Sequence, residues 1–250
     1  MRARILVAVG LVAAIAACGS ETPPAGGGSQ GGTVTVLAAA SLTESFTQIG
    51  KDFEAANPGL KVTFSFGGSS GLATQITSGA PADVFAAASP ATMKTVVEAG
   101  DATGTPVIFV RNQLVIAVPK GNPKGITSLD ALSEPGVKVA LCAEQVPCGA
   151  AAKKAGVEVE PVTLEQDVKA ALAKLKLGEV DAALVYRTDA KAAAADVDGV
   201  EFPESAGAIN DYPIAALTDA PNPAGAAAFV AYVQSAPALR VLTDAGFQKP

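Results

Sequence analysis

Strand patterns alternate with helix patterns along nearly the whole chain from Thr33 onward, and this alternation limits the fold more than any other feature. An apolar run over residues 33–40 predicts the first strand. A helix is predicted next, because large apolar residues then recur at helical spacing, at Leu42, Phe46, Ile49 and Phe53. Repeated units of this kind form α/β folds in which helices flank the sheets. The sequence therefore predicts an α/β fold with mostly parallel sheets.

The other elements follow from the same patterns and from the Pro, Gly and Asn residues that end them. Further strands are predicted over residues 61–66, 82–88, 137–141, 157–162 and 182–186. Further helices are predicted through Leu72 and Ile76, from Pro90 to Gly100, after Ser128, from near Gly149, over about 164–177, and over 224–234 and 238–246.

Two extended segments interrupt the alternation. In residues 105–119 the apolar runs 107–110 and 114–118 have no helix between them, and residues 212–217 form a second extended piece. Such segments can carry a chain from one lobe to another and back. We therefore expect two lobes with a ligand cleft between them, at the carboxyl ends of their strands. Lobe 1 is predicted from residues 33–112 and 212–250, and lobe 2 from residues 113–211.

The first residues have the pattern of a targeting segment. Arg2 and Arg4 precede a short apolar stretch that ends in Ile15-Ala16-Ala17-Cys18-Gly19. Small residues before a cysteine resemble the cleavage site of bacterial lipoproteins. We therefore expect residues 1–17 to be a signal peptide, Cys18 to be lipidated, and the Gly-, Pro- and Ser-rich residues 18–32 to be a flexible linker. The expected location is the outer face of the bacterial cytoplasmic membrane; the alternative is an ordinary secretory signal with an incidental cysteine.

Two cysteines remain after Cys18, and they lie six residues apart at Cys142 and Cys148. An even pair of cysteines in an exported chain predicts a disulfide, here closing a small loop. Two free buried thiols are the alternative.

The composition excludes several classes of function. The chain contains no histidine, which excludes Ser-His-Asp and Cys-His nucleophile systems. Without Arg2 and Arg4, 16 basic and 24 acidic side chains remain, so the mature chain is acidic and is not expected to bind nucleic acid. A hydrolase with a serine nucleophile and a lysine base is a remote alternative, because no Ser-x-x-Lys is present. We expect a binding protein rather than an enzyme.

Helix starts and hydroxyl groups follow several of the predicted strands. Ser41 follows the first strand, and Ser69 lies in the glycine-flanked loop 67–71. The first turn of a helix has unpaired N–H donors and roughly half a positive charge, which suits a small anion. Further candidates are the first-turn residues Cys148 and Val168 and the strand-end residue Tyr186. The alternatives are ordinary N-caps for the two serines and a core aromatic for Tyr186.

Six short motifs occur in the order seen in one family of transport proteins. They are Ala38-Ala39-Ala40-Ser41-Leu42, Phe66-Gly67-Gly68-Ser69-Ser70, Gly79-Ala80-Pro81-Ala82-Asp83-Val84-Phe85, Val146-Pro147-Cys148-Gly149, Asp167-Val168-Lys169-Ala170-Ala171-Leu172 and Val185-Tyr186-Arg187-Thr188-Asp189-Ala190. Over about residues 33–249 the chain resembles the periplasmic molybdate-binding proteins of ABC importers. The resemblance implies the two-lobed periplasmic-binding-protein fold of type II.

The resemblance also implies a ligand. The family binds molybdate and tungstate and delivers them to an ABC permease and its ATPase, so no cofactor is expected, and the protein is expected to be a monomer. Molybdenum is expected only as the oxyanion. By motif, hydroxyl contacts are implied from Ser41, Ser69 and Tyr186, and backbone N–H contacts from Ser41, Ser69, Cys148 and Val168. Another tetrahedral oxyanion, such as sulfate, is the alternative ligand.

Two residues depart from the pattern of the family. Cys148 stands where a small apolar residue such as alanine is often found, and Arg187 stands where glycine is common. A backbone contact survives the first change. The Arg187 guanidinium is expected to face solvent, and the alternative is an approach to the anion.

Overall fold

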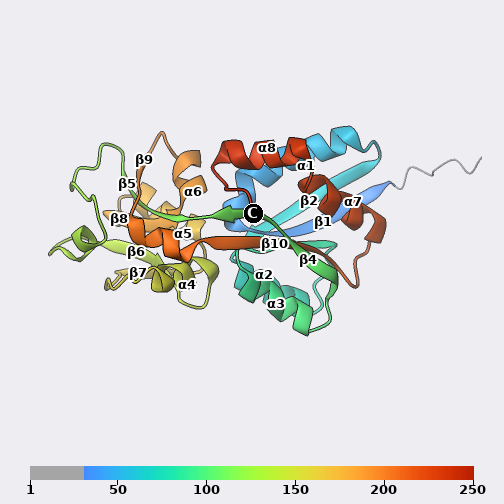
Figure 1. Cartoon of the computed structure of the whole chain (residues 1–250), viewed down its shortest axis with the longest axis horizontal. Helices are drawn as coiled ribbons and strands as arrows, with labels where there is room; N and C mark the ends of the chain where they lie inside the picture. Colours follow the sequence, from blue (N-terminus) through green and yellow to red (C-terminus); the bar gives the residue numbers. More distant parts are fainter. Residues whose placement is uncertain (1–30) are drawn as a thin grey trace, which may run out of the picture.

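The computed structural model describes residues 31–250 of the chain. The predicted signal peptide (1–17), Cys18 and all but the last two residues of the predicted linker (18–32) lie outside the described residues. The described residues form two bodies that lie side by side along the long axis of the molecule, each built on one five-stranded sheet (Figure 1).

The first sheet has the strand order β2-β1-β3-β10-β4 and, with its helices, is called lobe 1. Its strands are β1 (Gly32–Ala39), β2 (Leu60–Gly67), β3 (Val84–Ala86), β4 (Ala102–Asn112) and β10 (Asn210–Leu217). β10 lies inside this sheet, next to β4, although all strands of the second sheet separate the two in the sequence.

The second sheet has the strand order β7-β6-β8-β5-β9 and, with its helices, is called lobe 2. Its strands are β5 (Leu114–Pro119), β6 (Val139–Cys142), β7 (Thr163–Glu165), β8 (Ala182–Tyr186) and β9 (Val197–Val200). Only Gln113 separates β4 from β5, so the chain passes from the first sheet to the second at this residue, and it returns through β10.

Each sheet has a parallel half and an antiparallel half. β2, β1 and β3 are parallel, as are β7, β6 and β8. The strands that follow the two crossings, β5 and β10, run antiparallel to both of their neighbours. The predicted α/β fold with helix-flanked sheets is confirmed. The sheets are mixed rather than mostly parallel, because the two crossing strands enter from the opposite lobe.

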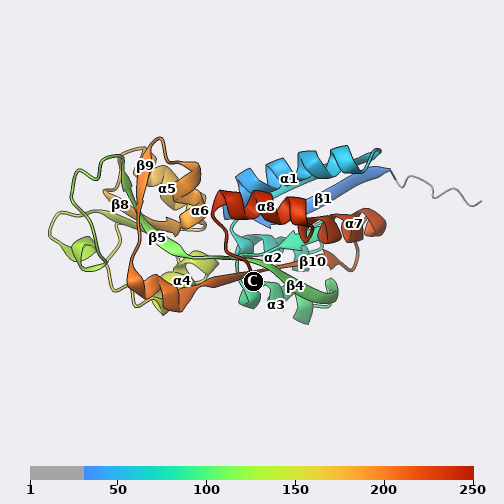
Figure 2. The ribbon, with the colours of Figure 1, turned by 45° about the horizontal axis from the view of Figure 1, so that its top comes forward.

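Helices pack on the sheets of both lobes. In lobe 1, α1, α7 and α8 lie on one face of the sheet and α2 and α3 on the other (Figure 2). Within residues 31–250 no single helix is long and apolar enough to cross a membrane, and α7 with α8 passes that test only as a pair bent by 60°. The helices are α1 (Thr43–Ala56), α2 (Ser69–Thr77), α3 (Pro90–Glu98), α4 (Pro147–Lys154), α5 (Val168–Lys176), α6 (Arg187–Ala192), α7 (Pro223–Val233) and α8 (Ala236–Ala245), with 3₁₀ turns η1 (Ala40–Leu42), η2 (Asp130–Ser133) and η3 (Pro203–Ala208).

The core of lobe 1 contains a cluster of aromatic rings from α1 and α7. Phe46 and Phe53 are fully buried and meet Phe229 edge to face, with ring centroids 5.9 and 5.3 Å from that of Phe229. This geometry is a favourable one for aromatic pairs. The buried carboxylate of Asp83 accepts hydrogen bonds from the backbone N–H groups of Thr35 and Asn222, each at 2.6 Å. These bonds tie β1 to the start of α7.

One predicted strand was wrong. Residues 157–162 are not a strand, and the strand of this region is β7, at Thr163–Glu165, which pairs with β6. Pro161 has no N–H group to donate to a sheet. The first hydrogen bond to the neighbouring strand therefore comes from Val162 N, which lies 2.9 Å from Val139 O.

The helix predicted over 164–177 begins later, at Val168, because Leu164 and Glu165 belong to β7. One α-helix and one strand were not predicted, namely α6 and β9. β9 contains Asp198 and Gly199, which are uncommon in strands, and it takes the strand conformation by pairing with β5.

Candidate functional site

A small cavity of about 20 Å³ lies between the two lobes. This volume is far below the roughly 300–1,000 Å³ of pockets that hold drug-sized ligands, and it suits only a very small guest. Its lining residues follow the carboxyl ends of three parallel strands in each lobe, which are β1, β2 and β3, and β6, β7 and β8. They are Ala39, Ala40, Ser41, Gly67, Gly68, Ser69, Ala88, Pro147, Cys148, Gln166, Asp167, Val168 and Tyr186.

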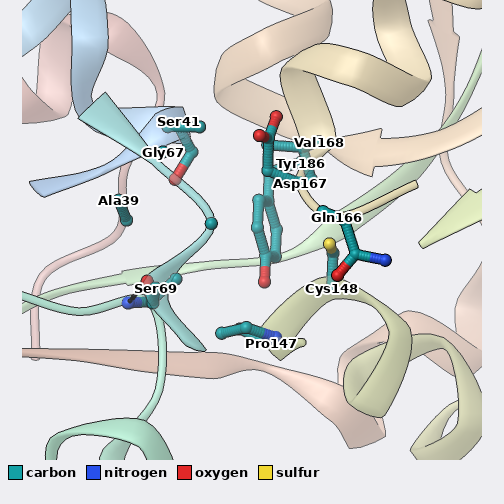
Figure 3. Close-up of a pocket in the computed structure, with 13 residues that line it drawn as sticks. Ala39, Ser41, Gly67, Ser69, Pro147, Cys148, Gln166, Asp167, Val168 and Tyr186 are labelled. Atoms are coloured by element: carbon teal, nitrogen blue, oxygen red, sulfur yellow. Dashed lines mark hydrogen bonds between the residues drawn. The ribbon is translucent and has the colours of Figure 1, made fainter. Parts of the chain in front are cut away.

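The cavity brings together all five residues that the sequence analysis proposed as anion contacts. In Figure 3 the Tyr186 side chain lies between the two serines on one side and Cys148 on the other. Gln166 and Asp167 also line the cavity and were not predicted. They fall inside the helix that was predicted over residues 164–177, whereas in the structure they form the loop between β7 and α5.

Ser41 lies in η1, directly after β1, and is buried. Its Oγ is 2.8 Å from the phenol oxygen of Tyr212, a residue of β10. Ser41 does not cap α1, whose N-cap residue is Leu42. The small side chains of Ala39 and Ala40 leave the backbone of this turn open toward the cavity.

Ser69 is the first residue of α2, whose N-cap is Gly68. Its Oγ accepts a hydrogen bond from the backbone N–H of Ala88 at 3.0 Å. Because that bond uses a lone pair of the oxygen, the hydroxyl proton remains available to a ligand. The N–H of Ser69 also has no partner within the helix, since it belongs to the first turn.

Cys148 lies in the first turn of α4, after Pro147, which has no N–H. The N-cap residue Val146 has no side-chain acceptor, so the N–H groups of the first turn have no cap. Cys148 forms the predicted disulfide with Cys142, with 5.7 Å between the two Cα atoms. The backbone at Gly149 packs closely against this loop, and a larger residue would not fit there, because its Cβ would overlap the carbonyl oxygen of Ala143.

Val168 is the first residue of α5, and Asp167 is its N-cap. The Asp167 carboxylate accepts hydrogen bonds from the N–H groups of Lys169 and Ala170, at 2.9 and 3.0 Å. The cap therefore satisfies the second and third N–H groups of the helix and leaves the first, that of Val168, for another acceptor.

Tyr186 ends β8 and is almost fully buried. Within residues 31–250 its hydroxyl group has no hydrogen-bond partner. Burial raises the pKa of this phenol well above its ordinary value, so the group keeps its proton and is a donor. A buried hydroxyl without a partner is costly, which makes it a candidate ligand contact.

Among the residues that line the cavity, only Asp167 has a charged side chain. Arg187, which follows Tyr186, faces away and forms an ion pair with Glu201, at 2.7 Å from Nε to Oε1. In the part of the chain that the structure describes, no group of three or more His, Cys, Asp or Glu side chains is placed to hold a metal ion. The cavity therefore offers N–H and O–H donors without a basic side chain.

The loop Gly67–Gly71 has the Gly-x-Ser-x-Gly spacing found at the nucleophile of α/β-hydrolases. A nucleophilic serine needs a base within hydrogen-bond distance. Among the described residues Ser69 Oγ is bonded only to the backbone N–H of Ala88, and the sequence contains no histidine. The geometry is that of a hydrogen-bond donor rather than of a nucleophile.

The two lobes touch on several sides of the cavity. Ser70 Oγ donates to the carbonyl oxygen of Gln145 at 2.8 Å, and Lys169 Nζ lies 2.7 Å from Glu44 Oε1. Gly68 packs directly on Gln166, because a Cβ on Gly68 would overlap the carbonyl oxygen of Gln166. These contacts hold the lobes in a closed arrangement around the cavity.

Comparison with known proteins is consistent with this geometry. The family model for bacterial extracellular solute-binding proteins matches residues 34–248. The molybdate-binding protein ModA of Mycobacterium tuberculosis is 46% identical over 252 residues, which cover 98% of this chain and 97% of that protein.

Two solved structures share the fold at lower sequence identity. The periplasmic molybdate-binding protein of Azotobacter vinelandii matches with a TM-score of 0.76 and 21% identity, over 87% of this chain and 99% of that chain. The sulfate-binding protein SubI of Mycobacterium tuberculosis also matches with a TM-score of 0.76 and 21% identity, over 87% of this chain and 86% of that chain.

Proposed function

Because the chain belongs to the bacterial extracellular solute-binding protein family, we propose that it binds molybdate outside the cytoplasm and delivers it to an ABC permease with its ATPase. The observation that carries the proposal is the cavity, which gathers hydroxyl and helix-start N–H donors from both lobes without a basic side chain. We assign oxyanion contacts to Ser41, Ser69, Cys148, Val168 and Tyr186. Tungstate is proposed as a second ligand because its charge and shape are nearly the same.

Neutral donors can hold a dianion only if there are many of them, since burying an unpaired charge is very costly. About seven hydrogen bonds to a charged acceptor, at roughly 1.5–3 kcal/mol each, amount to roughly 10–20 kcal/mol. Association and ordering cost about 4–15 kcal/mol. The balance corresponds to dissociation constants in about the micromolar to nanomolar range.

We propose that the lobes open to admit the anion and close over it. In this proposal lobe 1 consists of residues 33–112 and 212–250 and lobe 2 of residues 113–211. The two single-strand crossings and the contacts between Ser70 and Gln145 support it. Closure removes water from the anion, which strengthens each hydrogen bond. The closed form is then the state that the permease recognises.

We further propose that the protein is a monomer anchored through lipid on Cys18, after removal of residues 1–17. The support is the sequence Ile15-Ala16-Ala17-Cys18-Gly19 and the polar residues that follow it. Mass spectrometry of protein purified from membranes tests the anchor. A mature chain that begins at Cys18 with added lipid mass supports it, and an unmodified cysteine contradicts it.

Titration calorimetry with molybdate, tungstate, sulfate and phosphate tests the function. We expect one site per chain for molybdate and tungstate, weaker binding of sulfate and no binding of phosphate. Phosphate carries a proton near neutral pH, whereas the five proposed contacts are all donors, and Asp167, the one lining carboxylate, caps α5 through its Oδ1. Absence of binding to the first two anions contradicts the proposal. Equal affinity for sulfate assigns the protein to sulfate, and tight binding of phosphate assigns it to phosphate.

A further inference from the structure

Tyr212 lies behind the cavity rather than in it. It belongs to β10, is fully buried, and is not among the residues that line the cavity. The pairing of β10 with β4 shifts register between Tyr212 and Pro213, an irregularity of the kind that redirects side chains beside functional sites. The Tyr212 ring meets those of Tyr186 and Phe247 edge to face, with centroids 6.0 and 5.5 Å away.

The hydroxyl groups of Tyr212 and Ser41 lie 2.8 Å apart, a distance that does not by itself say which of them donates. Burial raises the pKa of the Tyr212 phenol far above its ordinary value, so the group keeps its proton. Ser41 Oγ is the partner at hydrogen-bond distance, and the side chains of Asn112 and Tyr186 also lie close enough to affect the pKa of this phenol. Donation from Tyr212 to Ser41 therefore satisfies the buried phenol proton.

The opposite direction is unfavourable once an anion is bound. If Ser41 donated to Tyr212, the phenol proton would have to turn to Asn112 or Tyr186 for an acceptor, and Ser41 would turn lone pairs toward a negatively charged ligand. A buried donor without an acceptor is costly. With Tyr212 as donor, the Ser41 proton is instead free to reach a ligand oxygen.

Ser69 shows the same arrangement with a different donor. Its Oγ accepts from the N–H of Ala88 at 3.0 Å, which leaves its own proton for the ligand. Each serine of the cavity is thus held by a donor from the protein, a backbone amide for Ser69 and a phenol for Ser41. Only the phenol can be removed by substitution.

We propose that Tyr212 is a positioning residue for oxyanion binding, which donates to Ser41 Oγ and thereby directs the Ser41 proton into the cavity. The inference rests on the proposed function. It assigns the hydroxyl groups of Ser41, Ser69 and Tyr186 as donors only, so the site favours ligand oxygens that carry no proton. Tyr212 acts through Ser41 and does not touch the ligand.

Tyr212→Phe tests the proposal, with Tyr232→Phe as the matched control. Tyr232 is half-buried beside Phe53, 5.4 Å between ring centroids, and lies away from the cavity. We expect Tyr212→Phe to weaken molybdate binding about tenfold or more, and Tyr232→Phe to change it less than twofold. In a Ser41→Ala background, Tyr212→Phe should cause no further loss, because the serine through which it acts is gone.

Two results overturn the proposal: wild-type affinity in Tyr212→Phe, or the same loss from Tyr212→Phe with and without Ser41. If wild-type protein binds no molybdate, tungstate or sulfate, the proposed function fails instead. If Tyr212→Phe does not fold, NMR of wild-type protein labelled at the tyrosine Cζ atoms and saturated with molybdate decides. A Tyr212 hydroxyl that exchanges slowly and donates to Ser41 supports the proposal, and a phenol that accepts from Ser41 overturns it.

Discussion

Tyr186 buries a hydroxyl group that has no hydrogen-bond partner within residues 31–250. We expect Tyr186→Phe to lose one hydrogen bond to a charged ligand, about 1.5–3 kcal/mol, which is roughly 10- to 150-fold in affinity. Without ligand the variant should be as stable as wild type or more so, because an unsatisfied group is removed. Calorimetry and thermal unfolding, with and without molybdate, measure the two effects. Unchanged affinity, or a large loss of stability without ligand, contradicts this assignment.

Single residues of the site differed in how well the sequence predicted them. Ser41, Ser69 and Tyr186 follow strand ends within recognisable motifs, and the cavity gathers all three. Tyr212 carries no such signal, because its contact with Ser41 joins residues 171 positions apart. Asp167 was missed for a local reason, since its role as a cap depends on where α5 begins.

At the scale of helices and strands, the sequence predicted the strongly patterned elements well. β1, β2, β8 and the helices of lobe 1 lie where apolar periodicity placed them. The errors lie where a short segment takes its conformation from its neighbours. β7 has three residues and β9 has four, and each is a strand because it pairs with β6 or β5. Such pairing is a tertiary effect that local propensity does not contain.

The disulfide loop is the element that most directly couples stability to the site. Between Cys142 and Cys148 it carries the Gln145 carbonyl, which accepts from Ser70 of lobe 1, and it ends at a residue that lines the cavity. We expect replacement of both cysteines by serine to lower the free energy of unfolding by about 2 kcal/mol. Molybdate binding should weaken as well, because the start of α4 and the contact to Ser70 lose their constraint.

Urea unfolding and calorimetry of the double variant measure both effects. Wild-type protein treated with reductant should behave like the variant, and the variant itself should not respond to reductant. A variant that is less stable but binds molybdate as tightly as wild type would show that the disulfide supports lobe 2 without positioning the site.

At the scale of the whole molecule, a chain of charges spans the two lobes. Lys169 Nζ of lobe 2 lies 2.7 Å from Glu44 Oε1 of lobe 1 and 3.2 Å from Asp189 Oδ1. Asp189 is fully buried, and its other oxygen accepts from the N–H of Tyr186 at 3.2 Å. Burial raises the pKa of Asp189 to about 6, although Lys169 opposes the shift.

This raised pKa makes the folded protein less stable as the pH rises from about 4 to about 6. An aspartate in the unfolded chain has a pKa of about 3.9, so between pH ~4 and ~6 the folded protein binds a proton that the unfolded chain does not. The contribution of Asp189 to the free energy of unfolding is therefore at its maximum below about pH 4 and is lost as the pH rises to about 6. We expect Asp189→Asn to remove this part of the pH dependence in urea unfolding, and the exposed Asp219→Asn to leave it unchanged. An identical pH profile in Asp189→Asn contradicts the assignment.

The two-lobed arrangement was predicted from a simple physical cue. Two extended segments without intervening helices are hard to place in one continuous α/β sheet, and they correspond to the β4–β5 pair and to β10. The sequence did not reveal that these strands run antiparallel to their neighbours. Strand direction depends on which lobe the chain comes from, and no local pattern records that.

The position of β10 also sets the order in which the chain can fold. β4 pairs in its sheet only with β10 among the described strands, so lobe 1 stays incomplete until residues 210–217 have been synthesised, after every strand of lobe 2. Pairing between such distant segments is slow, because the closure of a long loop precedes any gain. In a member of an exported family, this order leaves lobe 1, which carries Ser41 and Ser69, without its complete sheet until the chain has been made past residue 217, whereas the strands of lobe 2 come from one continuous stretch.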